Sequence, residues 1–153
     1  MGRVLQEIEV SLHAIAEFLD DTGWDAAPEP DRVVLHTKAG IGFSVRLDSE
    51  RKFILLATYL PVRKDFEEPL ELVNTLNREV FLGCFCIDDD RDLLVSYGMS
   101  YERGLILAQF SRIVMRFAGM LEHVVKNFDE NDLIFAFGAK DESSSDTPRP
   151  SLQ

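Results

Sequence analysis

The sequence has little positive charge, few cysteines and no long apolar run. Its 16 Lys and Arg residues are outnumbered by 27 Asp and Glu, which gives a formal net charge of -11 at pH 7. Proteins bind nucleic acids and anionic membrane surfaces through cationic side chains, and no basic stripe offsets the acidic balance here. We therefore expect neither nucleic acid nor a membrane as a partner, whereas a basic protein or peptide partner is compatible with the charge without being implied by it.

The two cysteines, Cys84 and Cys86, do not make a disulfide framework, so a reducing compartment is the default expectation. The first residues, MGRVLQEIEVSLH, lack the apolar core of a signal peptide. No apolar run approaches the roughly 20 residues that span a bilayer. Together these features predict a cytoplasmic protein.

The spacing of the cysteines is the sharpest local pattern. Residues i and i+2 of a strand face the same side, so Cys84 and Cys86 would point together. A thiolate metal site usually needs four ligands, and His13, His36 and His123 are each isolated in the sequence. A redox pair uses Cys-x-x-Cys at the start of a helix, which is absent. We interpret both cysteines as buried small hydrophobic residues and predict no metal site.

An acid-rich turn imitates a calcium-binding loop. Asp88, Asp90 and Asp92 occupy the first alternate positions of such a loop. Leu93 then stands where the loop needs Gly, and Met99 where it needs a bidentate Glu. The pattern therefore does not predict an EF-hand.

Three further patterns lack the context that their chemistry requires. The segment 40–42 (GIG) has no third glycine and no following helix, so it indicates a hairpin turn. Ser100 lacks the Gly-x-Ser-x-Gly setting of a nucleophile and is expected to cap a helix. Glu122 and His123 have no second His one turn later, so no zinc-protease motif exists. We predict no catalytic, cofactor-binding or metal-ligating residue.

Hydrophobic spacing at three and four residues predicts three helices. The first covers residues 3–20. The second starts near Glu68, places Pro69 in its first turn, where the missing N–H does no harm, and is broken by Gly83. The third covers residues 101–127, and its apolar stripe is interpreted as packing against a sheet, with a partner surface as the alternative.

Alternating or continuous apolar runs predict five strands, at residues 32–37, 42–47, 52–60, 84–87 and 93–97. Short polar connections favour an antiparallel meander for the first three strands, with the fully apolar third strand in the centre. The element order is α-β-β-β-α-β-β-α, which predicts an α+β fold with an antiparallel sheet and helices on one face.

The domain organisation follows from composition. Residues 1–137 are predicted to form a single α+β domain, in which a short apolar segment at 133–137 docks on the rest. Residues 138–153 are polar and contain proline, so this segment is predicted to be a disordered tail.

The stretch LPVRKDFEEPLELVNTLNREVFLGCFCIDDDRDLLVSYGMS carries a family resemblance. A strand ending at Pro61, an acidic lead-in to a helix with Leu76-Asn77-Arg78, the Gly83-x-Phe85 pair and an acid-rich hairpin follow one another. With the element order, this resembles the YbjN domain family and the type III secretion chaperone-like fold over residues 3–128. The resemblance implies a sensory-transduction regulator. Chaperones of that fold are small, acidic, cytoplasmic homodimers that hold a partly unfolded secretion substrate.

The second helix carries more apolar surface than one face needs, and such surface requires a cover. In the chaperone-like fold the middle helix contributes to a dimer. We therefore predict a homodimer through this helix and a neighbouring strand. The candidate dimer or partner surface consists of Leu70, Leu72, Val73, Leu76 and Phe81.

The leading hypothesis is a non-enzymatic, YbjN-type binding protein that dimerises and presents an apolar groove or a free sheet edge to a peptide. The alternative is a type III secretion chaperone. An enzyme with an unrecognised site is the third reading. No cofactor is expected.

Overall fold

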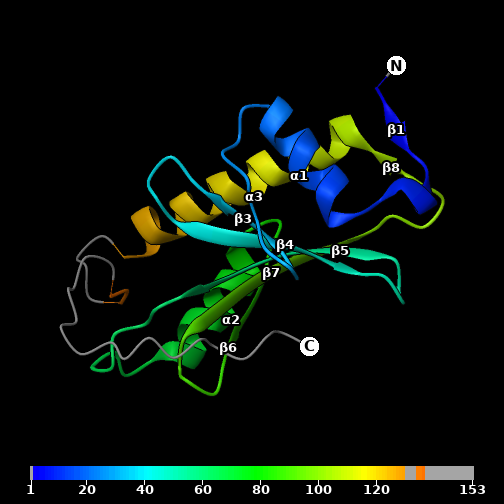
Figure 1. Ribbon diagram of the computed structural model, residues 1–153. Coiled ribbons are helices and arrows are strands. Elements are labelled where there is room, and N and C mark those ends of the chain that lie inside the picture. Colours follow the sequence, from blue (N-terminus) through cyan, green and yellow to red (C-terminus); the bar gives the residue numbers. More distant parts are fainter. Residues whose placement is uncertain (1, 130–133, 137–153) are drawn as a thin grey trace.

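The computed structural model describes residues 2–129 and 134–136. An antiparallel sheet with the order β2-β3-β4-β5-β7-β6 forms its centre, and α1 and α3 lie together on one side of this sheet (Figure 1). The α+β class and the order of the main elements are as predicted. The strands of the sheet are Ala27–Pro28 (β2), Val33–His36 (β3), Gly42–Asp48 (β4), Phe53–Leu60 (β5), Cys84–Ile87 (β6) and Leu93–Ser100 (β7).

The first helix is shorter than predicted. Helix α1 is Leu12–Asp21, and the Ser11 hydroxyl accepts the Ala14 N–H at 3.1 Å as its N-cap. Upstream, β1 (Val4–Leu5) pairs with β8 (Leu105–Ile106), and Glu7–Glu9 forms a single 3-10 turn, η1. The prediction of one helix over 3–20 was wrong, because this long-range pairing and the cap compete with the local helical spacing.

The third helix also begins later than predicted, at Leu107 rather than near residue 101. Helix α3 is Leu107–Phe128. Gly104 precedes it with φ +115°, and a Cβ there would lie 3.0 Å from the Leu5 carbonyl oxygen. The glycine therefore permits the tight turn that brings β8 against β1, and the helix starts only after this pairing.

The second helix, α2, is Pro69–Glu79, with Glu68 at the N-cap position, as the proline predicts. It ends four residues before Gly83, and the intervening Leu82 has a φ of 72°. Helix α2 lies along β6, at one end of the sheet.

The core lies between the sheet and the layer of α1 and α3. The ring of Phe43 on β4 is 5.5 Å from that of Phe117 on α3 and 5.9 Å from that of Trp24. These contacts join the two layers. The side chains that point from the sheet into this core are all 3% exposed or less: Val33, Leu35, Phe43, Val45, Ile54, Leu56, Leu60, Phe85, Leu93 and Val95.

A short segment after α3 returns to the sheet. The Asp129 carboxylate accepts the N–H groups of Ile134 and Phe135, each at 2.9 Å. Phe135 forms an isolated antiparallel bridge with Val62 and is 4% exposed. The predicted docking of an apolar segment is thus seen at 134–136. The other positions of that segment, and the predicted tail at 138–153, lie outside the described residues.

Within the described ranges, no helix is long and apolar enough to cross a membrane.

Candidate protein-binding surface

The β6 edge of the sheet is closed by a side chain of α2. The Asn77 amide donates to the carbonyl oxygen of Phe85 at 3.0 Å, and its carbonyl oxygen accepts the Phe85 N–H at 3.0 Å. Asn77 thereby takes the place of a neighbouring strand. A peptide that added to this edge would have to displace both bonds.

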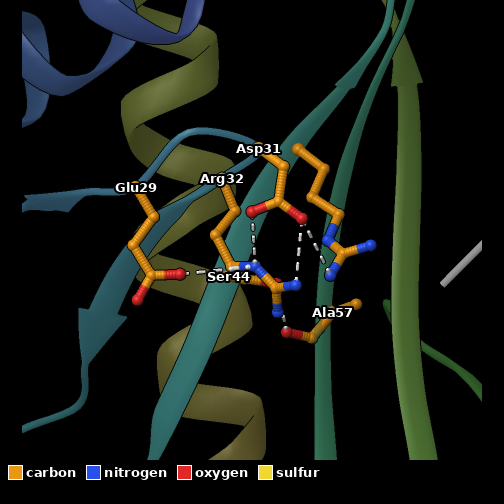
Figure 2. A network of polar contacts seen from close by, with 6 residues as sticks. Glu29, Asp31, Arg32, Ser44 and Ala57 are labelled. Carbon is orange, nitrogen blue, oxygen red and sulfur yellow. Dashed lines mark hydrogen bonds and ion pairs between the residues drawn. The ribbon is translucent and has the colours of Figure 1, made fainter. Parts of the chain in front are cut away.

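The opposite edge is short and polar. Strand β2 has two residues, and one is Pro28, which has no N–H to donate. Beyond it, the Arg32 guanidinium binds Asp31 at 3.1 Å and Glu29 at 3.5 Å, close to Ser44 (Figure 2). Arg32 lowers the pKa of Asp31, chiefly through this hydrogen bond. The free sheet edge of the leading hypothesis is therefore restricted at both ends of the sheet.

The side of the sheet away from α1 and α3 is uncharged and mostly apolar over three strands. Side chains alternate along β5, β6 and β7, so those next to buried residues point outward. None of the outward side chains is an acid, Lys or Arg, although charged residues make up 28% of the chain. We call this surface the outer patch: Phe53, Leu55, Ala57, Tyr59, Cys84, Cys86, Leu94, Ser96, Gly98 and Ser100.

The outer patch has two large side chains at one end. Phe53 is 39% exposed and Leu55 is 37% exposed. A Cβ on Gly98 would lie 3.2 Å from Leu55 Cδ2 and 3.8 Å from Phe53 Cδ1, so both side chains fold over this glycine. Depletion of charge with exposed aromatic and aliphatic groups is the composition of the centre of a protein interface.

Near the same end of the outer patch, on the β6 side, the loop between α2 and β6 projects an aromatic ring. Phe81 is 85% exposed. Leu82 has a positive φ, a conformation that costs energy for a branched residue. A Cβ at Gly83 would lie 3.0 Å from the Phe85 ring, so the buried Phe85 leaves no room for a side chain at Gly83. A hollow of about 360 Å³ separates Phe81 from Cys84 and Gly98. Phe81 is therefore held at the border of the outer patch.

The surface predicted from the sequence is divided by the structure. Leu76 is 0% and Leu72 is 8% exposed, so both belong to the core and their predicted surface role is corrected. Leu70 and Phe81 are exposed, at 72% and 85%, and Val73 is half-buried. The spacing of α2 did not reveal which side turns inward, because the helix packs at the end of the sheet rather than across it. The apolar outward side of β5 was missed, although FILLATYL contains its signal: apolar residues at both alternating sets of positions.

The expectation that both cysteines are buried was wrong, since Cys84 and Cys86 are exposed. Phe85 between them points into the core and is 2% exposed, so alternation turns its two neighbours outward. Partial burial raises the pKa of Cys86, and Cys84 and Asp88 raise it further. Its thiol is therefore neutral at pH 7. In the described part of the chain, no three His, Cys, Asp or Glu side chains gather to hold a metal ion.

A cleft of about 500 Å³ lies on the helical side of the molecule, between α1, α3 and the β3–β4 hairpin. Trp24 and Met115 line it, with His36 and Lys38 from the hairpin. Glu122 accepts the Ala39 N–H at 3.0 Å and so ties the hairpin to α3. This carboxylate has a structural role.

A model of the YbjN family, whose description is "Putative bacterial sensory transduction regulator", matches residues 11–130. The chain belongs to the YbjN family. No protein among the curated sequences matches it.

Three solved structures share the fold. YbjN from E. coli, described as a "putative transcription regulator", has a TM-score of 0.67 and 19% identity and covers 82% of this chain and 96% of its own. ExsC in the ExsC–ExsE complex has a TM-score of 0.56 and 20% identity, with coverages of 80% and 92%. The HopA1–SchA chaperone–effector complex has a TM-score of 0.51 and 15% identity, and the match covers 70% of this chain and 84% of the other. The type III secretion chaperone-like fold expected from the sequence is confirmed.

Proposed function

We propose that this member of the YbjN family is a non-enzymatic, cytoplasmic regulatory protein that forms a homodimer and binds a protein or peptide partner. One observation carries the proposal: the outer patch is uncharged and apolar in a chain with a net charge of -11. An antiparallel sheet that faces water normally carries polar residues on that side. The family and the fold neighbours add support, because their descriptions name regulation and complexes with proteins rather than a reaction.

The size of the outer patch indicates how the dimer is built. Strands β5 and β7 each have eight residues. At about 3.3 Å per residue and about 4.8 Å between strands, these two strands and the four-residue β6 offer about 320 Å² in plan. A standard interface covers roughly 800 Å² on each partner. We therefore infer that the interface extends past the sheet to Phe81 and to the exposed side of α2 with Leu70. This agrees with the prediction of a dimer through α2 and a neighbouring strand.

Light scattering tests the dimer. At micromolar concentration we expect a mass near 35 kDa, twice the 17.4 kDa of the chain. Phe81→Glu and Leu55→Glu each place a charge in the apolar interface and should shift the mass to that of one chain. Ile8→Glu is the matched control, because Ile8 is 95% exposed and lies outside the outer patch. A wild-type protein with the mass of one chain would contradict the dimer.

Co-purification from the source cell tests partner binding. We expect a protein to be retained by the wild-type chain through several washes and at physiological salt. If none is retained, the binding function is wrong, whatever the mass of the protein.

A dedicated secretion chaperone is the second candidate. ExsC and SchA share the fold, and each is seen in a complex with a partner protein. Their identities of 20% and 15% carry the fold alone. This candidate requires genes for a secretion system next to the gene for the chain, and their absence would exclude it in favour of the first.

A further inference from the structure

The exposed side of α3 forms a continuous surface that meets the proposed dimer interface only at Phe81. A hollow of about 490 Å³ is lined by Arg112, Met115 and Arg116. The cleft beside Trp24 shares Met115 with it and reaches Gly119. A third hollow, of about 370 Å³, shares Arg116 and Gly119 and ends at Phe81. We call this surface the α3 furrow: Ala108, Ser111, Arg112, Met115, Arg116 and Gly119.

The floor of the α3 furrow is apolar and open. Met115 is 63% exposed. A Cβ on Gly119 would meet nothing within 4 Å, so packing within the described residues does not explain a glycine in the middle of a helix. A glycine does allow the backbone of another chain to approach closely. Methionine adds an adaptable apolar contact at the same place.

The charge of the α3 furrow is opposite to that of the chain. Arg112 and Arg116 are one turn apart and both exposed, and no acidic residue occurs in α3 before Glu122. Neither arginine forms an ion pair with a residue in 2–129 or 134–136. In contrast, Arg32 and Arg51 each bind a carboxylate at 3.1 Å. A guanidinium pair of this kind is suited to carboxylates.

We propose that the α3 furrow binds an acidic amphipathic segment of a partner protein. This proposal rests on the proposed function as a protein-binding module and names the chemistry of its partner. Residues four apart in a helix are about 6 Å apart along the axis. The segment would therefore carry two carboxylates at about that spacing, with an apolar side chain between them that contacts Met115. A helix placed in a groove is a recurring mode of this recognition.

The experiment uses two fluorescent 18-residue synthetic peptides with the same leucine stripe on one helical face. One carries Glu at positions four apart beside the stripe, and its twin carries Lys at the same positions. Binding to the full chain is followed by anisotropy at low and high salt. Non-specific attraction to a chain of charge -11 favours the Lys peptide. A preference of at least tenfold for the Glu peptide is the expected result, and equal binding, preference for the Lys peptide or no binding of either would overturn the proposal.

Charge reversal localises the effect. The double variant R112E/R116E should lose at least tenfold in affinity for the Glu peptide and gain affinity for the Lys peptide, while Ile8→Glu leaves both unchanged. If the swap does not occur, the site is not the α3 furrow. Circular dichroism confirms that each variant is folded.

Two other occupants are outcomes of the same experiment. If R112E/R116E lowers the mass in light scattering, the furrow binds a second copy, and the proposal is overturned. Neutralising the acids of the last residues, as D141N/E142Q/D146N in the full chain, tests the chain's own C-terminal segment. A tenfold gain in affinity for the Glu peptide would identify that segment as the occupant of the α3 furrow, and the proposal of a partner protein would be overturned. A wild-type chain that is a single copy in solution but prefers the Glu peptide would refute the dimer and leave this inference standing.

Discussion

The two faces of β5 have the same hydrophobic character and very different surroundings. Ile54 and Leu56 point toward α1 and α3 and are 0% exposed, whereas Phe53 and Leu55 point outward and are 39% and 37% exposed. The helices of the same chain cover the inner face. The outer face carries uncharged, mostly apolar side chains, and α1 and α3 lie together on the opposite side of the sheet (Figure 1). The comparison teaches that hydrophobic character alone does not decide which side of a strand the helices cover, and it agrees with the proposal that another molecule binds the outer face.

The largest expected effect is a difference in the free energy of unfolding between two matched variants, one on each face of β5. Leu56→Ala leaves a cavity in the core and should lower the free energy of unfolding by about 2–5 kcal/mol. Leu55→Ala, one position away and on the outer face, should cost less than about 1 kcal/mol in the single chain. Urea unfolding at a concentration below dimer formation measures both. Equal losses would mean that the outer face is covered within the chain.

A smaller effect is expected at the closed edge. Asn77→Ala leaves the Phe85 N–H and carbonyl without their partner, and each bond contributes about 0.5–1.5 kcal/mol, so the loss should be about 1–3 kcal/mol. The variant should also aggregate faster, because an unprotected edge strand pairs with other chains. Thermal unfolding and light scattering measure the two consequences. Asn77→Asp keeps only an acceptor, so its free energy of unfolding should lie between those of the wild type and Asn77→Ala. A soluble alanine variant of wild-type stability would show that Asn77 does not protect the β6 edge.

On the outward side of α3, one substitution should stabilise the chain. Gly119→Ala adds a side chain in open space and improves helix propensity, so we expect a gain of up to about 1 kcal/mol in the free energy of unfolding. Denaturant unfolding measures it. A loss of stability would show that this side of α3 is packed like the inner side, and the α3 furrow would then not be an open surface.

The smallest effect concerns the thiol chemistry of the outer patch. Because the folded pKa of Cys86 is raised, its thiolate fraction at pH 8 is lower than in the unfolded chain. Alkylation with iodoacetamide should therefore be slower at Cys86 in the folded protein than in urea, and the difference should shrink as the pH rises through the folded pKa. Mass spectrometry of C84S isolates this site. In a dimer the rate should also fall with protein concentration, and a rate without that dependence would place Cys86 outside the interface.

Much of the fold followed from local periodicity. The strand at residues 84–87 and the helix that starts at Pro69 were found because alternation and the fixed φ of proline act within a few residues. The beginnings of α1 and α3 were not found, since both depend on the pairing of β1 with β8 across about a hundred residues of sequence. Of the candidate surface, Leu70 and Phe81 are exposed and Leu72 and Leu76 are not.

By itself, the sequence determined the order of the elements, the class of the fold and the acidic charge, because each is a property of composition or of short-range spacing. Only the tertiary structure decided which side of β5 meets the helices, that Phe85 rather than the flanking cysteines points inward, and that Asn77 closes the edge of β6. Periodicity separates two faces of an element without saying which one is covered. That choice is made by residues distant in the chain, which come together only when the sheet and its helices pack.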